Sequence, residues 1–78
     1  MKIYILTCIN EDADLVYCQP FCYLAEAQNT MKEMYEAERR EFEFNERLDD
    51  DYDVFSHKFA VIGNCDYHYN FRIDEREL

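Results

Sequence analysis

Acidic side chains are concentrated between residues 33 and 53, which hold ten carboxylates and three arginines. The carboxylates are Glu33, Glu36, Glu38, Glu41, Glu43, Glu46, Asp49, Asp50, Asp51 and Asp53. Duplex DNA carries closely spaced phosphates that basic clefts bind. Carboxylates on a rigid helix would present a similar row, with a spacing set by the helical turn of about 5.4 Å. We therefore predict a partner-binding surface formed by Glu33, Glu36, Glu43, Glu46, Asp49, Asp50, Asp51 and Asp53.

Part of this acidic segment is balanced by arginines on the same expected helix. Glu36 and Arg40 are four residues apart, as are Glu43 and Arg47, and the acid comes first in each pair. Such pairs stabilise a helix by about 0.2–0.5 kcal/mol each. A second interpretation is therefore that the acids form a solvated face that keeps a small protein soluble. Only the first interpretation predicts a loss of partner binding, with the chain still folded, when Asp49, Asp50, Asp51 and Asp53 are neutralised.

Three alternating aspartates, Asp49, Asp51 and Asp53, raise the hypothesis of a calcium-binding loop. An EF-hand loop that begins at Asp49 requires a glycine at its sixth position and a bidentate glutamate at its twelfth. Val54 and Ala60 occupy those two positions. The sequence therefore predicts no calcium site of this kind.

The four cysteines and two histidines raise the hypothesis of a zinc site. Cys18 and Cys22 are separated by three residues, and we expect Cys8 to face Cys18 across a hairpin. Structural zinc sites usually show two close pairs of ligands, and this chain has one at best. We predict instead that Cys8 and Cys18 are small buried apolar residues, and that the protein holds no metal and no cofactor.

Few residues in the chain could support nucleophilic catalysis. Cys65 precedes His68 by three residues across an expected turn, and His57 is the other histidine. The sequence shows no nucleophile elbow and no residue placed to orient a histidine. Its one glycine rules out a glycine-rich loop for an oxyanion or a phosphate. We therefore predict that the protein is not an enzyme.

The charge of the whole chain narrows the classes of partner. The 78 residues include 18 acids and 8 bases, which gives a formal net charge of −10. A field of this sign repels nucleic acids and anionic membranes and favours basic proteins. The sequence shows no signal peptide and no apolar run of membrane-spanning length. We expect a cytoplasmic protein with reduced thiols, whose partner is a basic protein that itself binds nucleic acid.

A long helix over residues 24–48 is expected to position these acids, since the segment contains no Gly and no Pro. Its apolar residues recur at steps of three, four or seven, which predicts one buried stripe. The stripe consists of Leu24, Ala27, Met31, Met34, Tyr35 and Phe42. Glutamates fall on or near the opposite side. We place the end of the helix between Phe42 and Leu48, before three aspartates whose charge opposes the helix dipole.

Four segments have the alternation or apolar content of strands, namely residues 2–9, 15–19, 57–64 and 66–74. Both faces of the first segment are apolar, which indicates an interior strand. Pro20 is expected to end the second strand because it has no N–H to donate. The last segment alternates, and its apolar side chains are expected to pack beneath the helix. They are Tyr67, Tyr69, Phe71 and Ile73.

These elements follow the order strand, strand, helix, strand, strand. An isolated hairpin is barely stable, so we expect the two hairpins to merge into one sheet. We predict a single α+β domain over residues 1–78, in which one long helix covers one face of a four-stranded, mainly antiparallel sheet. Residues 49–56 are assigned to a loop, and Gly63 and Asn64 suit a tight turn between the last two strands.

Three segments of the chain, KIYILT, AEAQNTMKEMYEAE and YHYNFRIDEREL, together resemble a group of small acidic proteins from bacterial genomes and their phages. The resemblance covers most of the chain and brings no catalytic residues with it. It implies a phage or mobile-element setting. Many small acidic proteins in that setting inhibit host defence systems, and anti-CRISPR and anti-restriction proteins are among them.

Two functions follow from these patterns as expectations. The first is a non-catalytic inhibitor that occupies a basic nucleic-acid-binding surface of a host defence protein by mimicking nucleic-acid charge. The alternative is a small regulatory domain that binds a ligand or metal and acts as a homo-oligomer, for instance a dimer through a sheet edge. Association that weakens steeply with salt favours the first. A small molecule that raises the melting temperature favours the second.

Overall fold

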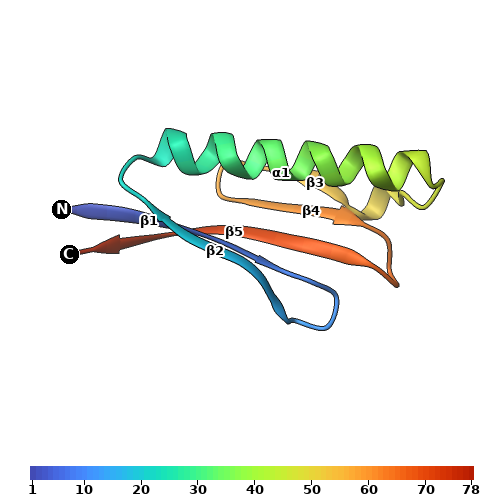
Figure 1. Ribbon diagram of the computed structural model, residues 1–78, viewed down its shortest axis with the longest axis horizontal. Coiled ribbons are helices and arrows are strands. Elements are labelled where there is room, and N and C mark those ends of the chain that lie inside the picture. The colour runs from blue at the N-terminus through green and yellow to red at the C-terminus, as the bar shows by residue number, and fades with distance from the viewer.

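One helix lies along one face of a five-stranded antiparallel sheet in the computed structural model, which describes residues 1–78 (Figure 1). The elements are β1 (Lys2–Ile9), β2 (Leu15–Phe21), α1 (Leu24–Phe44), a 3-10 helix η1 (Asp50–Tyr52), β3 (Asp53–Phe55), β4 (Phe59–Gly63) and β5 (His68–Glu77). The α+β class and the single covering helix are confirmed. The helix ends at Phe44, within the predicted range.

The sheet has the strand order β2-β1-β5-β4-β3, and every neighbouring pair is antiparallel. The two hairpins merge through β1 and β5, whose pairing runs from Lys2 opposite Glu77 to Ile9 opposite Asn70. This pairing confirms that β1 is an interior strand. It also brings the two chain ends side by side (Figure 1), where the Leu78 N–H donates to the Met1 carbonyl at 2.7 Å.

The hydrophobic core fills the space between α1 and the sheet. Its fully buried members are Leu6, Cys8, Ala27, Met31, Ala60, Ile62, Phe71 and Ile73. All six residues of the predicted helical stripe either belong to this core or pack against it. Tyr67 is the exception among the strand residues expected there: it is 56% exposed, because it precedes β5 and lies in the turn.

The prediction of four strands and of a loop over residues 49–56 is wrong. Asp53–Phe55 forms the short strand β3 at the edge of the sheet, with Val54 opposite Val61 on β4. Pairing with β4 supplies hydrogen bonds that the aspartate-rich segment does not provide for itself. Pro20 does not end β2 either: it lies opposite Ile5, and an edge strand tolerates a missing donor that faces away from its neighbour.

The helix is the element closest to membrane-spanning length, and it is not apolar enough to cross a membrane. It carries five of the ten acids between residues 33 and 53, of which Glu33, Glu36, Glu41 and Glu43 are exposed. Its C-terminal end leads into η1 and lies close to the turn between β4 and β5 (Figure 1).

Candidate functional site

The C-terminal end of α1 is closed by residues that reverse the chain tightly. Asn45 caps the helix, since its backbone N–H and its side-chain Nδ2 both donate to the Glu41 carbonyl, at 3.1 and 3.0 Å. Glu46 follows with a φ of +56°, a left-handed conformation that is uncommon for a residue other than glycine. The Arg47 N–H then donates to the Phe42 carbonyl at 2.8 Å. The acids that follow are thereby turned back toward the sheet.

Asp49 has a structural role in this turn. Its carboxylate accepts a hydrogen bond from the Asp51 N–H at 3.0 Å and so caps η1. Its own N–H donates to the Gly63 carbonyl at 2.9 Å, which attaches the segment to β4. Asp50 and Asp51 make no ion pair and remain exposed.

The turn between β4 and β5 brings a further acid to this end of the molecule. Asn64 Oδ1 accepts hydrogen bonds from the N–H groups of Asp66 and Tyr67, both at 2.9 Å. Asn64 Nδ2 donates to the Arg47 carbonyl at 2.7 Å, so the same side chain joins the turn to the end of the helix. Asp66 thus lies among acids that precede it by more than ten residues in the chain.

These contacts build an acidic end cluster around an open hollow of about 740 Å³. The cluster consists of Glu46, Asp49, Asp50, Asp51 and Asp66. Arg47 is the one basic side chain that lines the hollow, and Cys65 and Tyr67 complete its rim. Sequence reasoning missed Asp66, because only the contact between Asn64 and Arg47 shows that the turn and the helix end are neighbours.

Asp53 belongs to the interior of the fold more than to the acidic surface. Its carboxylate accepts hydrogen bonds from the Tyr35 hydroxyl and from Arg39 Nε, the second at 3.1 Å. Burial, followed by the hydrogen bond that its hydroxyl donates to Asp53, raises the pKa of Tyr35 to about 12. The hydrogen bond to Asp53 is also the main reason why the pKa of Arg39 rises further above its usual value. Asp53 therefore links β3 to α1.

The remaining predicted site residues lie on α1. Glu33 and Glu36 are exposed and make no ion pair, whereas Glu43 pairs with Arg39. The expected pairs of Glu36 with Arg40 and of Glu43 with Arg47 do not form. Arg47 lies beyond the end of the helix at Phe44, so the geometry of residues four apart on a helix no longer holds for it. An exposed pair such as Glu36 and Arg40 gains little from closing in water.

The two cysteines expected to face each other lie on opposite faces of the sheet. Cys8 is opposite Tyr17 and buried beneath the helix, whereas Cys18 is opposite Thr7 on the other face and exposed. The pairing is thus offset by one residue from the expected one, and the prediction that Cys18 is buried is wrong. No group of three or more His, Cys, Asp or Glu side chains is arranged to hold a metal ion.

Cys8 is buried and the other three cysteines are exposed, so we expect the four thiols to differ in reactivity. Burial raises the pKa of the Cys8 thiol to about 12, and the Glu38 carboxylate adds to the rise. Because the thiolate is the reactive form, we expect iodoacetamide to modify only the exposed Cys18, Cys22 and Cys65 at neutral pH. Intact mass would show three additions in the folded protein and four after denaturation. Four additions at equal rates in the folded protein would contradict the buried position of Cys8.

Glu38 is a carboxylate whose ionisation opposes folding. Burial, followed by the neighbouring charge of Glu41, raises its pKa above the usual 4.5. Folding therefore takes up a proton between the two pKa values, and this residue destabilises the fold increasingly as the pH rises through that range. We expect Glu38→Gln to raise the melting temperature at neutral pH, by an amount worth less than about 1 kcal/mol because solvent screens a half-buried group. Melting curves at several pH values should show the gain disappear in acid.

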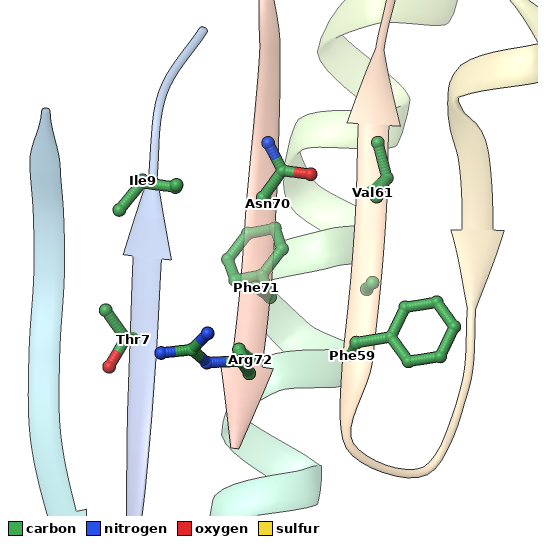
Figure 2. A pocket seen from close by; sticks show the side chains of 8 residues that line it. Thr7, Ile9, Phe59, Val61, Asn70, Phe71 and Arg72 are labelled. Atoms are coloured by element: carbon green, nitrogen blue, oxygen red, sulfur yellow. The ribbon is translucent and has the colours of Figure 1, made fainter. Parts of the chain in front are cut away.

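A second candidate site is the sheet face that no helix covers. A shallow hollow of about 260 Å³ lies there between β1 and β4 (Figure 2). Thr7 and Ile9 line one side, Phe59 and Val61 the other, and Asn70 and Arg72 of β5 lie between them.

Comparison with known proteins finds no matching family model, no matching curated protein and no matching solved structure.

Proposed function

We propose that this protein is a non-catalytic binding protein whose acidic surface occupies a basic, nucleic-acid-binding surface of another protein. The resemblance to small acidic phage proteins supports a host defence protein as the target, in the cytoplasm of the host cell. The carboxylates would stand in for the phosphates that the target normally binds. No catalytic step is part of this function.

The observation that carries the proposal is the acidic end cluster. Five carboxylates and a single guanidinium surround an open hollow at the C-terminal end of a helix. Glu46 follows the end of α1 by two residues, and its charge opposes the helix dipole at a cost of roughly 0.3–1 kcal/mol. Asp50, Asp51 and Asp66 make no ion pair that would offset the repulsion among the clustered carboxylates. An arrangement that works against local stability is expected at a functional site.

The helix extends this negative surface along the molecule. Glu33 and Glu36 are exposed on α1, and at a rise of about 1.5 Å per residue they lie about 12–17 Å along the helix axis from Phe44, where the helix ends. A basic groove built for a nucleic-acid backbone is complementary to such a row of charges, and the attraction accelerates association. Together the exposed helix acids and the end cluster form the proposed binding surface.

The proposal can be tested by competition with nucleic acid. The protein would be immobilised and exposed to a bacterial lysate, and the bound fraction would then be washed with duplex DNA or with increasing salt. We expect a basic nucleic-acid-binding protein to be retained, to be released by the DNA, and to bind with a steep dependence on salt. A retained partner that neither DNA nor salt displaces would contradict the proposed mimicry.

The alternative function, a regulatory domain that binds a small ligand, has weaker support. The hollow on the open sheet face, about 260 Å³, is below the range of about 300–1,000 Å³ usual for small-molecule sites. That alternative also includes a homo-oligomer. The apolar residues on the same sheet face support this part of it independently of any ligand.

A further inference from the structure

The sheet face opposite α1 is apolar although nothing in the monomer covers it. We call this surface the open sheet face, and its apolar residues include Ile3, Ile5, Ile9, Val54, Phe59 and Val61. An antiparallel sheet with one face toward water normally carries polar residues on that face. Phe59 is 49% exposed and Val54 is 40% exposed. The composition of the open sheet face is therefore that of a surface which becomes buried.

The charge of the open sheet face differs from that of the rest of the molecule. In a chain of net charge −10, the β5 residues on this face that carry a formal charge are two arginines, Arg72 and Arg76, and one aspartate, Asp74. The acidic surface lies on the helix and at its end, behind the sheet. Two copies that meet through their open sheet faces would thus avoid the repulsion between their acidic surfaces.

We infer that two copies of this chain pack open sheet face against open sheet face, with a two-fold axis over β5 near Ile73. Arg72 Nε is 2.9 Å from Asp74 Oδ2 within one chain, and both side chains lie on the open sheet face at the middle of β5. A two-fold axis between these residues places Arg72 of each copy opposite Asp74 of the other. The contact is then complementary to itself, as a closed dimer requires.

The open sheet face is just large enough for a weak dimer. The strands differ in length, from three residues in β3 to ten in β5, and at about 3.3 Å per residue and about 4.8 Å between strands they cover roughly 500 Å² on each copy. The two faces together would bury roughly 1,000 Å², which is about the smallest area expected of a biological interface. We expect a reversible dimer whose dissociation is measurable by dilution.

The hollow on this face offers room for a side chain of the second copy. Figure 2 shows Thr7 and Ile9 on β1 and Val61 on β4 around it, with Phe59 turned toward β3. The hollow is therefore flanked by apolar side chains of β1 and β4. Filling the hollow from the facing copy would remove apolar surface from water at the centre of the interface, where burial contributes most.

Exchanging the charges of Arg72 and Asp74 tests whether these residues pair between two copies or only within one chain. In Arg72→Glu, each copy would place the introduced carboxylate opposite Asp74 of the other, and in Asp74→Arg two arginines would meet. We expect each variant alone to dimerise at least about tenfold more weakly than the native chain, because like charges are brought together. A mixture of the two variants pairs opposite charges and should form a heterodimer. Sedimentation velocity would measure all three samples.

Two further variants separate the open sheet face from other exposed apolar residues. Val61→Lys places a charge beside the hollow, on β4, and should give a monomer, with circular dichroism to show that it folds. Phe44→Lys removes the most exposed large apolar residue, which is 87% exposed at the end of α1, and should leave the dimer intact. A native chain that remains monomeric at high concentration, or a mixture that fails to restore association, would overturn the inference.

Discussion

Neutralising three exposed aspartates of the acidic end cluster is expected to weaken binding of the basic partner by about five- to 150-fold, which corresponds to roughly 1–3 kcal/mol. The three changes are Asp50→Asn, Asp51→Asn and Asp66→Asn. Each of these carboxylates is exposed and free of ion pairs, so the fold should keep its stability. The salt dependence of binding should also become shallower, because fewer charges take part.

Asp49 and Asp53 are left unchanged in this variant because they stabilise the fold. Asp49 caps η1, and Asp53 receives hydrogen bonds from Tyr35 and Arg39. Removing either would confuse a loss of binding with a loss of structure. The sequence alone grouped all four aspartates together, and the structure divides them into two exposed residues and two that support the fold.

A matched control tests whether position matters or only net charge. Glu26→Gln, Glu75→Gln and Glu77→Gln remove the same number of charges from the opposite end of the molecule, near the helix start and the C-terminus (Figure 1). Glu75 and Glu77 pair with Lys2 and the N-terminal amine, but both pairs are exposed and contribute little to stability. The control variant should bind nearly as well as the native chain. Equal losses in the two variants would show that the partner responds to overall charge, and the end cluster would then have no special role.

The fold could be predicted where one residue pattern decides one element. The apolar stripe from Leu24 to Phe42 identified the helix and its buried face, since a spacing of three and four residues is specific to a helix. The alternation in β5 likewise identified the strand that lies at the centre of the sheet. In both cases the local pattern and the tertiary packing favour the same structure.

Prediction failed where tertiary contacts override local preference. Residues Asp53–Phe55 follow a run of aspartates and form β3 only because the edge of β4 is available to them. Pro20 continues β2 because that strand lies at the edge of the sheet, which the sequence of the segment does not reveal. Arg39 pairs with both Glu43 and Asp53, and the second partner becomes adjacent only after β3 joins the sheet.

In the candidate site too, some residues could be predicted from a local pattern and others depend on tertiary contacts. The acids of the end cluster that are adjacent in the chain were visible in the sequence, since they follow a predicted helix end. Asp66 was not, because it reaches the cluster through the contact of Asn64 with the Arg47 carbonyl, 17 residues away. The open sheet face was visible only as the second apolar face of β1, and its exposure depends on which face the helix covers.

Gly63→Ala is expected to destabilise the protein by about 2–5 kcal/mol, the sum of backbone strain and a forced displacement. Gly63 has a φ of +139°, which side chains rarely permit. A Cβ atom there would lie 2.3 Å from the Tyr67 carbonyl oxygen and 2.7 Å from the Cα of His68. Both are backbone atoms of the turn, so they cannot move aside as a flexible side chain would.

The size of this effect follows from what Gly63 connects. It lies opposite His68 in the β4–β5 pairing, and its carbonyl accepts the hydrogen bond from the Asp49 N–H at 2.9 Å. A displacement would therefore disturb the sheet and the attachment of η1 together. A chain of 78 residues is expected to be stable by only about 4–12 kcal/mol. The substitution would consume a large part of that margin.

Urea unfolding followed by circular dichroism measures the loss as a lower midpoint, with an unchanged slope if the unfolding remains two-state. Cys65→Ala is the control, because it alters an exposed residue of the same turn and should change stability by no more than about 0.5 kcal/mol. A native-like midpoint for Gly63→Ala would mean that the turn relaxes without cost. A relaxed turn would move Asp66 relative to Asp50 and Asp51, so such a variant should then bind the basic partner less well while remaining stable.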